Sequence, residues 1–96
     1  MGFEEISKTK LVGGPVDYYT EITTTNLYVA TVFGDAMNTI TLSNDSATDS
    51  VQASYDGATI ETELKPNESV TLNVMGRNSI YLKGTAGSGK VRIWGW

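Results

Sequence analysis

The chain contains no cysteine and no histidine among its 96 residues. Without cysteine it can form no disulfide, and it offers no thiolate as a nucleophile or as a zinc ligand. Without histidine it lacks the commonest general base and the commonest transition-metal ligand of proteins. The sequence therefore predicts no catalytic residue, no metal site and no cofactor.

Basic side chains are also scarce, because 7 Lys and Arg stand against 11 Asp and Glu, for a net charge of −4. These basic residues are scattered among acidic ones, whereas binding to duplex nucleic acid requires clustered Lys and Arg. No apolar run approaches the roughly 18 residues that a membrane-spanning helix needs. We therefore expect neither nucleic acid nor a membrane as a partner.

The sequence also lacks any sustained helical period of 3.6 residues, so we expect at most one helical turn, near residues 35–37. Thr, Val, Ile and Tyr are abundant, and turn residues recur about every eight to twelve positions, as in sandwiches and barrels. This pattern predicts an all-β protein with about eight short antiparallel strands in a two-sheet, jelly-roll-like sandwich. We expect an extended N-terminal arm over residues 1–15 and a single β-sandwich domain over residues 16–96, because Gly13-Gly14-Pro15 breaks regular structure.

Three glycine-containing turns are expected to separate strands. Gly34-Asp35 and Gly76-Arg77-Asn78 each read as the end of one strand and the start of another. Asp56-Gly57 predicts a type I′ hairpin, which needs positive φ at both central residues.

The strand expected after that hairpin, over residues 58–64, has an unusual pattern. Ile60, Thr62 and Leu64 are expected to face the core. Glu61 and Glu63 then face water on the opposite side. A pair of carboxylates also suits a glycosidase, but exposed charges on a strand more often keep a sheet edge from pairing with other chains. We interpret the two glutamates as edge protection.

The stretch GTAGSGK, residues 84–90, matches the G-x-x-x-x-G-K pattern of a phosphate-binding loop. Such a loop needs a following helix, whose N–H groups hold the phosphates, and a Ser or Thr after the Lys. Here Val91 takes that position and begins the β-like run VRIW. We interpret the stretch as a hairpin loop whose glycines supply positive φ, and not as a nucleotide site.

Trp94 and Trp96 lie on the opposite side of the last strand from Val91 and Ile93. If the two β-branched residues fill the core, both tryptophans project outward and need a partner, a sugar or the arm to cover them. Arg92 shares their side, and interfaces between proteins favour Trp, Tyr and Arg. Two adjacent tyrosines near the arm are expected on the same surface. The predicted partner-contact residues are Phe3, Tyr18, Tyr19, Arg92, Trp94 and Trp96.

The pattern from about residue 40 to residue 96 resembles the small β-sandwich virion proteins of tailed bacteriophages. The most specific piece is the ending GSGKVRIWGW, and the next is the Asp-Gly hairpin followed by LKPNES. Proteins of this kind occur on capsids or in the head and tail assembly. The resemblance implies a chain without a catalytic site that binds other virion proteins in symmetric copies.

From this resemblance we expect a non-enzymatic virion structural protein, a capsid decoration (cement) or minor capsid component, assembled in the host cytoplasm. Its expected partners are the major capsid protein or other virion proteins, and its copies are expected to form a homo-oligomer or a symmetric array. Two alternatives remain open. One is a carbohydrate-binding β-sandwich module with Trp94, Trp96 and Tyr81 as a stacking platform, and the other is a tail or head–tail connector subunit.

Overall fold

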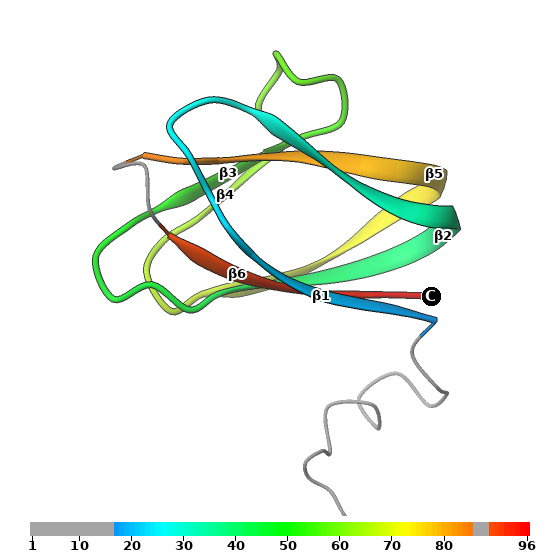
Figure 1. The fold of residues 1–96 in the computed structure, drawn as a ribbon, viewed down its shortest axis with the longest axis horizontal. Helices are drawn as coiled ribbons and strands as arrows, with labels where there is room; N and C mark the ends of the chain where they lie inside the picture. Colours follow the sequence, from blue (N-terminus) through cyan, green and yellow to red (C-terminus); the bar gives the residue numbers. More distant parts are fainter. Residues whose placement is uncertain (1–16, 86–88) are drawn as a thin grey trace, which may run out of the picture.

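The computed structural model describes residues 17–85 and 89–96, and every regular element in them is a β-strand (Figure 1). The predicted arm, with Phe3, lies outside the described residues. All neighbouring strands are antiparallel and form one six-stranded sheet in the order β1-β6-β2-β5-β3-β4. The strands are β1 Tyr18–Thr23, β2 Val29–Asn44, β3 Val51–Ser54, β4 Thr62–Leu64, β5 Ser69–Gly84 and β6 Lys90–Gly95. The all-β prediction is confirmed, but the described residues form six strands in one sheet instead of about eight strands in two.

The difference in strand count comes from β2 and β5, which are 16 residues long and bend in the middle. The first part of β2, Val29 to Val32, pairs with Ser79 to Leu82 in the last part of β5. The second part of β2, Thr39 to Ser43, pairs with Ser69 to Asn73 in the first part of β5. Each of these two strands therefore occupies the place of two predicted strands.

The predicted turns at Gly34-Asp35 and Gly76-Arg77-Asn78 lie inside these long strands and bend them. Gly34 has a φ of 90° and Gly76 has a φ of 81°, and the pairing register shifts between Val32 and Met37. A glycine with positive φ and an irregular register turn a strand without ending it. The helical turn predicted near residues 35–37 is also wrong, because these residues belong to β2.

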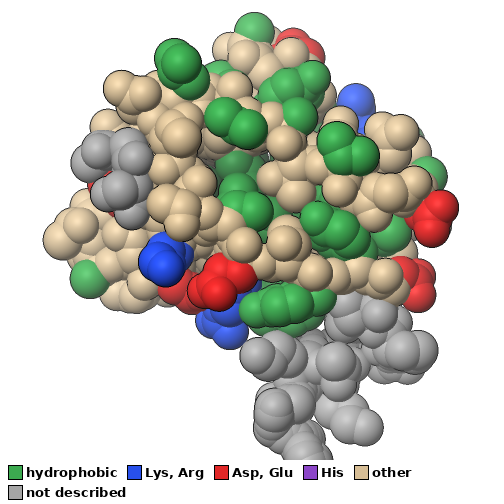
Figure 2. Space-filling view, viewed as in Figure 1, with side chains coloured by type: hydrophobic (Ala, Val, Ile, Leu, Met, Phe, Trp, Pro, Cys, Tyr) green, Lys and Arg blue, Asp and Glu red, His purple; other side chains and the backbone are tan. Residues whose placement is uncertain are grey.

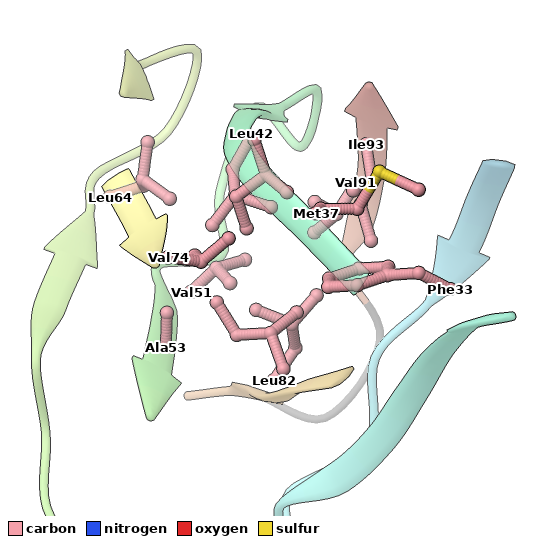
Figure 3. Packing of buried hydrophobic residues seen from close by; sticks show 12 residues of the cluster. Phe33, Met37, Leu42, Val51, Ala53, Leu64, Val74, Leu82, Val91 and Ile93 are labelled. Carbon is pink, nitrogen blue, oxygen red and sulfur yellow. The ribbon is translucent and has the colours of Figure 1, made fainter. Parts of the chain in front are cut away.

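The bent strands allow one sheet to surround one hydrophobic core (Figure 3). Alternate residues of both parts of β2 and β5 point inward, as the two-residue period of a strand requires. Burying a Val, Leu, Ile or Phe side chain stabilises the fold by roughly 1.5–3 kcal/mol, so this cluster is the main source of stability. Its members are Phe33, Met37, Ile40, Leu42, Val51, Ala53, Leu64, Val74, Ile80, Leu82, Val91 and Ile93.

The loop between β3 and β4 is wider than the predicted two-residue hairpin. Gly57 has a φ of 84°, but Asp56 is not among the residues with positive φ, so the type I′ prediction is wrong. Instead, the Asp56 carboxylate organises the loop. Its Oδ1 atom accepts hydrogen bonds from the N–H groups of Ala58 and Thr59, each at 2.8 Å, and from the Ser54 hydroxyl at 2.9 Å.

The wider loop shortens the strand that follows it. Ile60 lies in the loop and is 53% exposed, so its predicted inward position is wrong. Leu64 is buried as predicted, and Thr62 is half-buried. Glu61 and Glu63 face solvent as predicted, at the end of the sheet that β4 forms.

The Asp56 loop gives a prediction on pH dependence. Hydrogen bonds from the Thr59 and Ala58 N–H groups hold the pKa of the Asp56 carboxyl well below its usual range. A lowered pKa means that the carboxylate stabilises the fold above the unfolded-state pKa of about 3.9, and that this stabilisation is lost as the pH falls further.

We expect Asp56→Asn to melt below the wild-type temperature at neutral pH, because the amide lacks the charge that strengthens these bonds. The difference in Tm should shrink between about pH 4 and pH 2, because the Asp56 carboxyl of the unfolded chain takes up a proton in this range while that of the folded wild type stays ionised. Circular-dichroism melts of both proteins over this range measure the difference. A difference that stays constant down to about pH 2 would contradict this role of the carboxylate.

Candidate functional site

The predicted contact residues of the last strand lie on the side of the sheet that faces away from the core. Along β6, Val91 and Ile93 are buried toward the core, so Arg92 and Trp94 point to the other side. Strand pairing places a row of partners beside each of these two residues across β1, β2 and β5. We call the two rows the outer face: Tyr19, Trp94, Thr41 and Thr71 form the first, and Glu21, Arg92, Ser43 and Ser69 form the second.

The centre of the outer face is an aromatic pair. The ring centroids of Tyr19 and Trp94 are 5.5 Å apart, with the ring planes tilted by 49°. Trp94 is only 7% exposed, whereas Tyr19 is 49% exposed. Trp94 therefore lies on the predicted side of the sheet, but it is almost fully covered and leaves little surface for a partner. Tyr19 is the accessible ring of the pair.

Arg92 is held in one orientation beside this pair. Its guanidinium donates two hydrogen bonds to the Asp45 carboxylate, from Nε to Oδ2 and from NH2 to Oδ1, the latter at 3.0 Å. The hydrogen bond with Asp45 raises the pKa of Arg92. The guanidinium carbon also lies 5.0 Å from the centroid of the Trp94 ring. A two-bond pair together with a ring contact fixes a long side chain that would otherwise sample many rotamers.

Hydroxyl groups continue the outer face across β2 and β5. The Thr41 and Thr71 hydroxyl oxygens are 3.0 Å apart and share a hydrogen bond. The Ser43 hydroxyl donates to Asp45 Oδ1 at 3.2 Å, which links it to the Arg92 pair. The result is a strip of small polar groups next to the aromatic pair, able to donate and to accept hydrogen bonds.

Two other predicted contact residues have different surroundings. Tyr18 points toward the core, where its ring packs edge-on against Phe33 with centroids 5.3 Å apart. Adjacent strand residues face opposite sides, so the expectation that Tyr18 and Tyr19 share one surface is wrong. Trp96 is half-buried, and its main chain pairs with β2 through hydrogen bonds from Trp96 N to Thr39 O at 2.9 Å and from Asn38 N to Trp96 O at 2.7 Å.

Tyr81 does not join the tryptophans in a stacking platform. It lies opposite Ala30 and Ser54, in the part of the sheet formed by β2, β5 and β3. A Cβ atom on Gly57 would lie 3.2 Å from the Tyr81 ring, so the Asp56 loop covers this side chain. Trp94 and Tyr81 both point away from the shared core, from different parts of the sheet, and the three rings predicted for sugar stacking are not brought together.

The GTAGSGK stretch connects β5 to β6, which begins at Lys90, one residue before the predicted start. The β-strand after the stretch is as predicted, but β5 and β6 are separated by β2 in the sheet, so the predicted hairpin is wrong. The glycines of this stretch at 84 and 89 do not have positive φ, contrary to prediction, and Gly87 lies outside the described residues. Gly84 is needed for space instead, and the space around Gly89 is tight. A Cβ atom on Gly84 would lie 2.3 Å from the Thr24 hydroxyl oxygen, and a Cβ atom on Gly89 would lie 3.3 Å from the Asp49 Cβ atom.

Three loop aspartates, Asp45, Asp49 and Asp56, have separate surroundings. Asp45 binds Arg92, Asp49 is buried beneath Gly84, and Asp56 bonds its own loop. Among residues 17–85 and 89–96, no three His, Cys, Asp or Glu side chains group as metal ligands. In the same part of the chain, no helix has the length and apolarity to cross a membrane.

Comparison with known proteins identifies the fold but no family. No protein-family model and no curated protein matches the sequence. Among solved structures, the chain is similar to one described as the solution NMR structure of a de novo designed double-stranded beta-helix. The likeness has a TM-score of 0.53 and 19% sequence identity, and it covers 81% of this chain and 97% of the designed one.

Proposed function

We propose that this chain is a non-enzymatic structural protein of a bacteriophage virion, a capsid decoration or minor capsid component that binds another virion protein through the outer face. One observation carries the proposal: the exposed Tyr19 ring rests on the covered Trp94 ring, next to an Arg92 guanidinium that Asp45 holds in place. The resemblance of residues 40–96 to small phage virion proteins supports the choice of partner.

The outer face has the composition and rigidity of a protein-binding surface. Tyr, Trp and Arg dominate the binding energy of most protein interfaces. Because Trp94 supports Tyr19 and Asp45 orients Arg92, little side-chain entropy remains to be lost on binding. The hydroxyl groups of Thr41 and Thr71 extend the surface with polar groups, as in the rim of many interfaces.

In this proposal the bent β2 and β5 divide the sheet into the two layers of a jelly-roll-like sandwich. The layer built from β1, β6, β2 and β5 attaches to the virion, and the other layer stiffens it from behind. Copies bind at symmetric positions of the shell after assembly in the host cytoplasm. The net negative charge of the chain keeps unattached copies soluble.

Replacement of Tyr19 tests the attachment surface. We expect Tyr19→Ala to weaken binding to phage particles that lack the protein by at least about tenfold, because the ring would be the central anchor. Co-sedimentation of purified protein with such particles measures the dissociation constant. Ile60→Ala is the matched control, because Ile60 is also about half exposed but lies outside the outer face. Equal binding by the wild type and Tyr19→Ala would contradict attachment through the outer face.

The same protein samples separate the alternatives. Wild-type binding on a glycan array, lost in Tyr19→Ala, would favour the carbohydrate-binding module. Electron micrographs with labelled protein at the tail or at the head–tail junction, and not over the shell, would favour the connector subunit.

A further inference from the structure

The first part of β2, from Val29 to Val32, has an unpaired backbone edge. Within the described residues these positions pair with β5 on one side, whereas the second part of β2 pairs with both β5 and β6. Figure 1 shows this segment running between the connection from β1 and the bend of β2. Unpaired N–H and C=O groups along such an edge can pair with another extended strand.

This edge carries exposed apolar side chains and no charge. Val29 is 53% exposed and Val32 is 63% exposed, and Ala30 and Thr31 between them are uncharged. In the same view, Figure 2 shows several hydrophobic side chains at the surface in the upper half of the molecule, where this segment runs in Figure 1. Natural edge strands usually carry charges or proline, which prevent pairing with other chains. The edge of β2 has neither.

The other unpaired strand edges of the sheet differ from the edge of β2. β1 carries Glu21, and β4 carries Glu63, with Glu61 immediately before the strand. The first part of β5 is uncharged, but its apolar residues Val70 and Leu72 are partly buried against the core. Among the described strands, only the first part of β2 combines a free edge, exposed apolar side chains and no charge.

We propose that two copies of this chain pair through the free edges of β2, antiparallel and related by a two-fold axis at Thr31. In this arrangement Thr31 opposes its own copy, Val29 opposes Phe33 of the second copy, and Ala30 opposes Val32. Each pair of opposing residues therefore consists of two apolar residues or of two threonines. The segment is complementary to itself, which is the requirement for a two-fold interface.

The charged residues at the two ends of the edge are also complementary. Asp35 follows the segment at one end, and at the other end the Lys83 ammonium lies 4.8 Å from the centroid of the Tyr28 ring. Antiparallel pairing brings Asp35 of one copy to the Tyr28–Lys83 end of the second copy, and the two-fold axis repeats this contact. Opposite charges then meet at both ends, while parallel pairing would place like charges together.

This interface is independent of the outer face, because it uses the part of the sheet formed by β2, β5 and β3. It concerns the association of the chain with itself and goes beyond the proposed virion attachment. A dimer of this kind would carry two outer faces, so it would raise the effective strength of attachment without any new contact.

Sedimentation velocity of the full chain over a range of concentrations tests the pairing. We expect a reversible dimer for the wild type. For Val32→Lys we expect at least a tenfold increase in the dimer dissociation constant, because each copy would place a lysine at the edge that pairs with the other copy. Ile60→Lys is the matched control, since Ile60 is also exposed but lies away from β2, and it should dimerise like the wild type. A monomeric wild type, or a Val32→Lys variant that dimerises unchanged, overturns the proposal.

A single cysteine tests the position of the axis. The natural chain contains none, so Thr31→Cys introduces the only thiol. Opposed residues of an antiparallel pair lie about 4.5–5.5 Å apart at Cα, within disulfide reach. We expect a disulfide-linked dimer on mild oxidation of Thr31→Cys, and little from Thr23→Cys on β1. Equal crosslinking of the two variants counts against the axis at Thr31.

Hydrogen exchange identifies what occupies the edge. We expect the amides of residues 29–33 to become more protected as the protein concentration rises, and this gain to be absent in Val32→Lys. Protection that is already complete in a monomer would show that the edge is covered within a single chain, and would overturn the pairing of two copies.

Discussion

Asn44→Ala is expected to lower the free energy of unfolding by about 3–5 kcal/mol, a large part of the roughly 5–15 kcal/mol that holds a domain folded. Asn44 is fully buried at the end of β2. Its Nδ2 atom donates to the carbonyl oxygens of Asp49 at 2.8 Å, Lys65 at 3.1 Å and Leu64 at 3.2 Å. Its Oδ1 atom accepts from the Ser46 N–H at 3.1 Å.

The expected loss of stability in Asn44→Ala follows from the buried backbone groups that lose their hydrogen-bond partner. Alanine removes a donor from the Asp49 and Leu64 carbonyl oxygens and the acceptor for the Ser46 N–H, whereas Lys65 O keeps its hydrogen bond from the Glu68 N–H. Each buried group left unpaired costs about 1–3 kcal/mol unless water reaches it. These groups belong to the loop after β2 and to the end of β4, so one side chain joins two segments distant in sequence. Thermal denaturation should show a Tm at least about 12 °C lower, since 1 kcal/mol corresponds to roughly 4–8 °C in a domain of this size.

Asn73→Ala is the matched control for that variant. Asn73 is exposed, and its side chain accepts one hydrogen bond, from the Met75 N–H at 3.1 Å. We expect a loss below about 1 kcal/mol for this substitution. Similar losses in the two variants would show that the hydrogen bonds of Asn44 do not join the loops as described.

Gly84→Ala is expected to cost about 2–5 kcal/mol, although it adds only one methyl group. The new Cβ atom would lie 2.3 Å from the Thr24 hydroxyl oxygen and 3.2 Å from Asp49 Oδ2. The Thr24 hydroxyl cannot move away freely, because it donates to Gly89 O at 3.1 Å and accepts from Gly89 N at 2.9 Å. Rotating it would break two buried hydrogen bonds at the junction of β5 and β6.

A double-mutant cycle isolates this contact. Thr24→Ala removes the hydroxyl, so Gly84→Ala should cost less in the Thr24→Ala background than in the wild type. Gly95→Ala is a matched control at another buried glycine, where the new Cβ atom would meet the flexible Met37 side chain at 3.1–3.2 Å. We expect it to cost less than about 1.5 kcal/mol. Additive losses for Gly84→Ala and Thr24→Ala, measured by urea denaturation, would rule out the predicted clash.

The inward positions of several strands could be predicted, because a strand has a strict two-residue period. Ile40 and Leu42, and likewise Val91 and Ile93, are fully buried at alternating positions. The same period placed Arg92 and Trp94 on the side away from the core. It could not predict how exposed Trp94 is, because its cover includes Tyr19, which is more than seventy positions away in the chain and reaches it only through the pairing of β1 with β6.

The number of strands was harder to predict, because a glycine with positive φ serves a turn and a bend equally well. Gly34 and Gly76 looked like the ends of strands, and the sequence contains no local signal that the chain continues as one strand beyond them. Which outcome occurs depends on whether the residues on both sides find partners in the same strand. β2 and β5 meet that condition, because they pair with each other at both ends.

The sequence by itself determined the all-β class, the alternating core positions and the absence of charge from residues 29–33, since composition and a two-residue period are local properties. Only the tertiary structure decided that two strands bend instead of ending, that Tyr19 and not Trp94 is the accessible ring, and that Gly84 is required for space. These outcomes depend on which strands become neighbours. The order of the strands depends on how the whole sheet packs around one core. Residues throughout the chain contribute to that packing.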